Sequence, residues 1–129
     1  MSLLTEANFG ASLPIDGYGP GFFRVAGEVT RGSVWVAGEE MGSWGGLDDR
    51  APLLALAGKL DVLFIGTGEE IAHLPKDLVA ELEAEGLMCE GMATPSAART
   101  YNVLLSEGRR VGCALIAMPE TPATPETPE

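Results

Sequence analysis

The sequence predicts an α/β fold in which a central sheet with at least one parallel crossover is covered by helices. Two observations support this prediction. From Ala51 onward, short apolar runs alternate with amphipathic stretches in the order helix, strand, helix, strand, helix, strand, which is typical of crossover units. Before Ala51 the chain is rich in glycine, aromatic and β-branched residues, which favours strands and tight turns.

The N-terminal third is expected to be a β-hairpin. Residues 22–25 and 28–36 are predicted strands, because Phe23 and Val25 alternate with Arg24, and Val34 and Val36 flank Trp35. A tight turn at Ala26-Gly27 is expected to join them. Ahead of the hairpin, residues 15–21 contain too many glycines for regular structure and are expected to form a turn-bearing lead-in. The hairpin must then join the central sheet or pack across it.

The remaining elements follow from hydrophobic periodicity and end signals. One helix has leucines on one face, carboxylates on the other and a glycine at its end, and another begins at a Thr-Pro pair and stops at a glycine. The strands between them are short apolar runs. The predicted helices are residues 52–59, 75–85 and 95–107, and the predicted strands are residues 61–65, 87–92 and 110–117.

Length and composition favour one domain. The chain has 129 residues, of which 46% are hydrophobic, enough for one core and too few for two. We expect residues 1–12 to be an N-terminal lead-in and residues 13–118 to form the domain. Residues 119–129 contain only proline, threonine, glutamate and alanine, so they are expected to be a disordered tail.

The charge of the chain restricts its partners. The formal net charge is −11, and the first 118 residues alone hold 16 acidic and 8 basic side chains. Such a surface disfavours nucleic acid or an anionic membrane as the main partner. It suits a neutral or basic protein partner, although the same charge also serves solubility alone.

Cysteine usage and hydropathy indicate a cytoplasmic chain. Cys89 and Cys113 each lie in an apolar, strand-like stretch, where a cysteine usually acts as a small buried hydrophobe in a reducing compartment. No window of about 18 apolar residues could span a bilayer, and the N-terminus lacks the pattern of a signal peptide. We therefore expect neither membrane insertion nor export.

A glycine-rich bend after the most apolar strand is the first candidate site. Residues 62–65 lead directly into Gly66, Thr67 and Gly68, and open α/β sheets bind ligands where such strands end. A dinucleotide site is disfavoured, because Ile71 replaces the third glycine of the fingerprint and two glutamates precede it. The open alternatives are a shallow crevice for a small ligand or peptide, and a sharp chain exit without a ligand.

The second candidate lies at the start of the helix after the next strand. If the two strands are parallel, Thr94 and Ser96 open on the same sheet edge as the glycine bend, and Arg99 adds a positive charge one turn later. Free N–H groups and this charge would suit an anion or carboxylate. Helix capping by Thr94 and Ser96 is the alternative. The candidate set also includes Thr100, Tyr101 and Asn102, of which Asn102 could equally hold a neighbouring loop.

No catalytic, metal or cofactor pattern is present. His73 is the single histidine and lies beside Leu74-Pro75, where a structural role is the more common one. No Cys/His spacing suits zinc, no calcium loop occurs and no G-x-S-x-G elbow is found. Nothing in the sequence therefore requires an enzyme, a metal or a cofactor.

An ordered set of short motifs resembles one known family over about residues 13–117. It is similar to the domain-of-unknown-function family whose eukaryotic members include a mitochondrial assembly factor for respiratory complex I and an adipogenesis-associated protein. The motifs are residues 15–19, 23–25, 32–34, Trp44, 66–68 and 99–104.

The resemblance implies a three-layer α/β fold with a central mixed sheet, helices on its faces and a β-hairpin layer. It implies a bacterial, cytoplasmic member that works as a non-enzymatic interaction or assembly factor for a larger complex. Where some members carry a cysteine, this chain has Ala97-Ala98, which disfavours thiol chemistry. The alternative function is a small-molecule or anion-binding domain, or an enzyme, that uses a crevice between the Gly66 bend and the Thr94 helix start.

Overall fold

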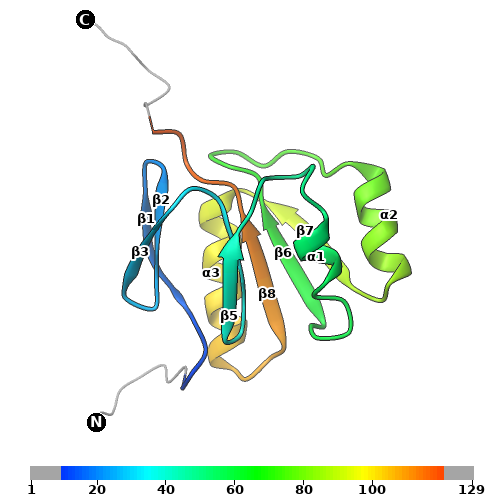
Figure 1. Cartoon of the computed structure of the whole chain (residues 1–129), viewed down its shortest axis with the longest axis horizontal. Helices are drawn as coiled ribbons and strands as arrows, with labels where there is room; N and C mark the ends of the chain where they lie inside the picture. Colours follow the sequence, from blue (N-terminus) through cyan, green and yellow to red (C-terminus); the bar gives the residue numbers. More distant parts are fainter. Residues whose placement is uncertain (1–9, 121–129) are drawn as a thin grey trace, which may run out of the picture.

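A computed structural model describes residues 10–120 and contains two sheets and three helices (Figure 1). The smaller sheet is antiparallel, with the strands in sequence order. Its strands are β1 (Ile15–Gly19), β2 (Phe22–Val25) and β3 (Glu28–Arg31). The predicted lead-in at residues 1–12 and tail at residues 119–129 lie almost wholly outside the described residues.

The larger sheet has five strands in the order β5-β4-β8-β6-β7. Strand β6 pairs in parallel with both β7 and β8, whereas β4 pairs antiparallel with β5 and β8. The predicted mixed sheet is therefore confirmed. Its strands are β4 (Val34–Ala37), β5 (Glu40–Ser43), β6 (Val62–Gly66), β7 (Met88–Met92) and β8 (Val111–Leu115).

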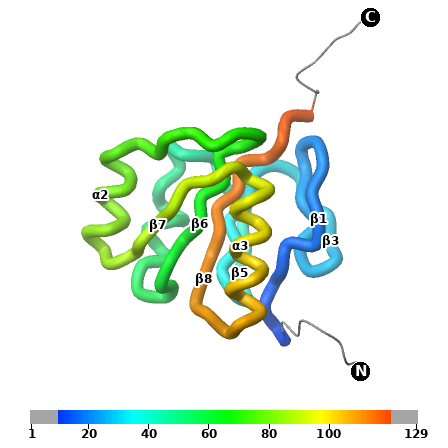
Figure 2. The backbone as a smooth tube through the Cα atoms, turned by 180° about the vertical axis from the view of Figure 1, so that it is seen from behind, coloured from blue at the N-terminus to red at the C-terminus, as the bar shows by residue number. Residues whose placement is uncertain are grey.

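Helices and the smaller sheet cover the two faces of the larger sheet. Helices α1 (Ala51–Leu54) and α2 (Lys76–Ala84) lie on one face. Helix α3 (Thr94–Ser106) and the three-stranded sheet lie on the other, as Figures 1 and 2 show from opposite sides. The predicted three-layer α/β class is confirmed.

Two apolar cores lie on opposite faces of the larger sheet, because successive strand residues point to opposite sides. On β8, Cys113 and Leu115 pack with α3 and the three-stranded sheet, whereas Ala114 packs with the core beneath α1 and α2. On β6, Phe64 joins the first core and Leu63 the second. Both strands are buried on both faces, which explains their continuous apolar sequences.

The glycine-rich segment expected to be irregular is strand β1, so that prediction was wrong. Strand β1 pairs with β2, and its register shifts between Ile15 and Gly17. Ile15 is 5% exposed within the first core. Its burial and the hydrogen bonds to β2 outweigh the low strand propensity of glycine.

The predicted strand at residues 28–36 is divided between the two sheets. Gly32 has a φ of +84°, a conformation that glycine adopts readily, and the chain leaves β3 there to begin β4 in the larger sheet. The tight turn between β2 and β3 is confirmed, since Ala26 and Gly27 have φ values of +49° and +87°. The β4–β5 hairpin was not predicted.

The three helices lie where the sequence predicted them, although their lengths differ in detail. Helix α1 is shorter than predicted, because after Leu54 the backbone continues in i→i+3 turns as far as Lys59. On α3, Leu105 is buried, whereas the apolar side chain of Val103 is 50% exposed. Within residues 10–120 the longest helices are too short or too polar to cross a bilayer.

Candidate functional site

The two loops singled out by the sequence meet at one edge of the larger sheet. Because β6 and β7 are parallel, the glycine bend after β6 and the start of α3 after β7 lie side by side. The Thr67 N–H donates to the Met92 carbonyl at 2.9 Å, and the Thr94 N–H donates to the Gly68 carbonyl at 2.8 Å. The predicted juxtaposition is therefore present, and backbone hydrogen bonds join the two loops.

Thr94 bridges three segments and does not cap α3. Its hydroxyl accepts a hydrogen bond from the Gly68 N–H at 2.9 Å and donates one to the Ile116 carbonyl at 2.8 Å. The side chain is fully buried. The N-cap residue is Ala93, without a side-chain cap. The predicted capping role was wrong, because the hydroxyl is committed to two buried backbone groups.

The glycines of the bend serve close packing. A Cβ on Gly66 would lie 2.8 Å from the backbone Cα of Thr94, closer than real Cβ atoms come, and 3.0 Å from a Leu115 methyl, which is also a tight contact. Gly68 has a φ of +102°, which side-chain-bearing residues rarely adopt. The Thr67 hydroxyl donates to the Glu70 carbonyl at 2.7 Å and accepts from the Ala72 N–H at 3.0 Å, so it shapes the following loop.

Tyr101 and Asn102 of α3 hold the start of β1 and the residues just before it. The Tyr101 hydroxyl donates to the Leu13 carbonyl at 2.8 Å. The Asn102 side chain accepts from the Ile15 N–H and donates to the Ile15 carbonyl, both at 2.8 Å. Burial raises the pKa of Tyr101, so its hydroxyl stays protonated at neutral pH. Asn102 therefore has a structural role, and the segment that it holds is the start of strand β1, not a loop.

Ser96, Arg99 and Thr100 are the candidate residues with the most available side chains. Ser96 and Arg99 are exposed, and within residues 10–120 neither side chain forms a hydrogen bond or ion pair. Thr100 is half-buried, and its hydroxyl lies 3.7 Å from the Met92 sulfur. Whether a ligand or partner contacts these residues remains a prediction.

The cysteines are placed for packing. Cys113 is buried and Cys89 is half-buried, and both are free. Burial raises the pKa of both thiols, and Glu83 adds to the effect at Cys89. Neither group is therefore an activated thiolate. Within the part of the chain that the structure describes, His, Cys, Asp and Glu do not gather in a group of three that could hold a metal.

An apolar strip beside α3 was not predicted from the sequence. Helix α3 packs mainly on β6 and β8 and only slightly on β7. In Figure 2, β7 lies on the side of β6 that faces away from α3. Val62, Met92 and Leu104 are half-buried at the margin of the first core, and Met88 is 65% exposed. We call these four residues the β7 strip. The spacing of Met88 and Met92, four residues apart on one strand, was the available signal.

One cavity lies beside the loop that Thr67 shapes, just after the glycine bend, and a larger one lies away from both loops. The smaller, about 250 Å³, is lined by Ile71, Ala72, His73, Leu74 and Gly91. Neither cavity is lined by residues 66–68 or 94–102. The larger cavity lies at the opposite end of the sheet.

Comparison with known proteins finds a family and close relatives. A family model described as "Protein of unknown function (DUF498/DUF598)" matches residues 15–116. An uncharacterized protein of Rhodobacter capsulatus is 61% identical over 114 residues, or 88% of this chain and 92% of that protein. NADH dehydrogenase (ubiquinone) 1 alpha subcomplex assembly factor 3 of Danio rerio is 28% identical over 116 residues, or 84% of this chain and 67% of that protein.

Solved structures share the fold. The crystal structure of an outer membrane protein from Bartonella henselae superposes with a TM-score of 0.76 at 35% identity. The superposition covers 83% of this chain and 96% of that chain.

Proposed function

The chain belongs to the DUF498/DUF598 family of proteins of unknown function, and on this basis we propose that it is a non-enzymatic protein that assists assembly of a larger respiratory complex. The observation that carries the proposal is the alignment with the Danio rerio assembly factor, which covers 84% of this chain. The similarity therefore extends over most of the domain.

The β7 edge is our candidate partner-binding surface. Strand β7 ends the five-stranded sheet and pairs with β6 on one side only. Among the described residues, its outward N–H and C=O groups have no strand partner. Such an edge is a template for an added strand from another chain.

The side chains beside this edge suit a protein partner. The β7 strip offers two methionines, Met88 and Met92, with Glu90 between them on the same face of β7, and Val62 pairs with Met88 across the sheet. Methionine is enriched at interfaces and adapts its shape to different partners. Thr100 contacts Met92, so the exposed side of α3 that carries Ser96 lies next to the strip.

Charge favours a neutral or basic partner segment. Glu90 is exposed on β7, and Glu83 of α2 lies close enough to Cys89 of β7 to contribute to its raised pKa. The chain carries a net charge of −11, which would steer a basic segment toward it and repel an acidic one.

The proposed location is the bacterial cytoplasm. The close relative is from Rhodobacter capsulatus, and both cysteines are free, which suits a reducing compartment. The partner would then bind from the cytoplasmic side of the membrane.

Capture from cells tests this function. The tagged chain replaces the native copy, membranes are solubilised in mild detergent, and captured proteins are quantified by mass spectrometry. We expect subunits of the respiratory NADH dehydrogenase to be enriched. Met88→Glu should reduce their recovery about tenfold, because the change introduces a charge at the interface core and a loss of roughly 1.4 kcal/mol is tenfold in affinity.

Val29→Glu is the matched control. Val29 is 59% exposed on β3 of the other sheet, so this variant introduces the same charge at a similar exposure and should recover the wild-type amount. Equal recovery by both variants would contradict binding at β7. Wild-type chain that captures no respiratory subunit would contradict the function itself.

A further inference from the structure

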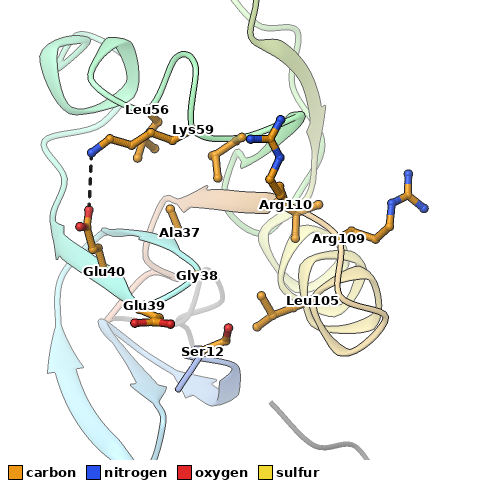
Figure 3. A pocket seen from close by; sticks show the side chains of 12 residues that line it. Ser12, Ala37, Gly38, Glu39, Glu40, Leu56, Lys59, Leu105, Arg109 and Arg110 are labelled. Carbon is orange, nitrogen blue, oxygen red and sulfur yellow. Dashed lines mark ion pairs between the residues drawn. The ribbon is translucent and has the colours of Figure 1, made fainter. Parts of the chain in front are cut away.

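A cavity of about 460 Å³ lies at the end of the sheet opposite the Gly66 bend (Figure 3). Four segments meet there: the lead-in to β1, the β4–β5 turn, the chain after α1, and the end of α3 with the following loop. Its volume is in the range of small-molecule sites.

The floor of the cavity is apolar. Leu56, Leu60, Leu105 and Val111 line it, and each is at most 7% exposed. In Figure 3 the Ser12 hydroxyl points into the space between Leu105 and Glu39. An apolar group that displaces water from this floor would therefore bind with a favourable change in free energy.

The rim of the cavity concentrates positive charge. Lys59, Arg109 and Arg110 are three of the eight basic residues in a chain with nineteen acidic ones. Lys59 lies 4.0 Å from Glu40, and Arg110 lies 2.8 Å from Asp61.

These cations are available to a ligand. All four side chains in the two ion pairs are more than half exposed, so the pairs are weak. Arg109 is exposed, and within residues 10–120 its side chain has no ion pair.

We propose that this cavity binds a small carboxylate with an apolar body. The apolar part would occupy the leucine floor, and the carboxylate would meet the rim guanidinium groups, whose forked donors match its two oxygens. Arg109 is exposed and points away from the cavity in Figure 3, so its side chain would turn inward to bind. Glu39 and Glu40 also line the cavity, and their charges disfavour a ligand with a second negative charge, such as a phosphate monoester. The inference is independent of the partner proposed for β7.

Titration with sodium octanoate tests the proposal, with amide shifts from NMR as the readout. Octanoate should bind saturably and shift residues of the β4–β5 turn and the α3–β8 loop. Arg109→Ala should weaken octanoate binding about fivefold, which is the loss of affinity expected when a partly exposed ion pair is removed. Ser12→Phe should abolish binding, because the ring would fill the space that the hydroxyl now faces.

Arg31→Ala is the control, since it removes the same charge from exposed β3 and should leave the octanoate affinity unchanged. Acetate, which lacks the apolar body, and 1-octanol, which lacks the charge, should each bind at least about tenfold more weakly. Absence of saturable shifts at the cavity, or equal affinity for octanoate in wild type, Arg109→Ala and Ser12→Phe, would overturn the proposal. Equal affinity for octanoate and 1-octanol would contradict binding of the carboxylate by the basic side chains at the rim.

Discussion

Phe23→Ala is expected to lower the free energy of unfolding by about 3 to 5 kcal/mol, the usual cost of removing a buried phenyl ring. Phe23 is 0% exposed and belongs to the core formed by the three-stranded sheet, α3 and β8. Removing the ring leaves a cavity between the two sheets. Because small domains have about 5 to 15 kcal/mol of stability in total, this loss should be easily measured by urea unfolding.

Val29→Ala provides the comparison for this prediction. Val29 belongs to the same small sheet but is 59% exposed, so its truncation should change the free energy of unfolding by less than about 0.5 kcal/mol. Similar effects of the two substitutions would mean that the small sheet does not pack on the larger one through Phe23.

Thr94→Val should lower the free energy of unfolding by about 2 to 5 kcal/mol, although the two side chains have nearly the same shape. The substitution leaves the Gly68 N–H and the Ile116 carbonyl without their partner at a fully buried position. Each buried group left unsatisfied costs about 1 to 3 kcal/mol. Urea unfolding of wild type and variant measures the difference.

Ser96→Ala tests whether the effect is specific to Thr94. Ser96 lies in the same turn of α3 but is exposed, and its truncation should stay within about 0.5 kcal/mol of wild type. If Thr94→Val were equally mild, the hydroxyl bridge would not be what joins the two loops.

The C-terminal half of the fold was predictable because its signals are local. Strands β6 and β8 are short apolar runs, and α2 and α3 have an apolar face and end at Gly86 and Gly108. In each case one stretch of sequence contains both the periodicity and the end signal.

The N-terminal half was predicted less well because its strands depend on distant contacts. Strand β1 is glycine-rich, and it is held by β2 and by Asn102, which is 87 residues from Ile15 in the sequence. The change of sheet at Gly32 likewise depends on β8, the partner of β4. No local pattern carries this information.

The location of the candidate site was predictable, but the roles of its residues were not. Parallel strands bring Gly66 and Thr94 to one edge, as the alternation of elements implied. Whether Thr94 caps a helix or bridges two loops depends on Ile116, which belongs to a third segment. The larger cavity was missed for the same reason, because its lining runs from Ser12 to Val111.

Binding of a protein partner along β7 can be measured by amide hydrogen exchange in the captured complex. The amides of β7 should exchange at least about tenfold more slowly in the complex than in the free chain, because an added strand pairs with them. Strand β5 is the opposite edge of the same sheet, and its amides should exchange at the same rate in both states. Unchanged exchange at β7, with protection at β5 or β3 instead, would contradict partner binding along β7.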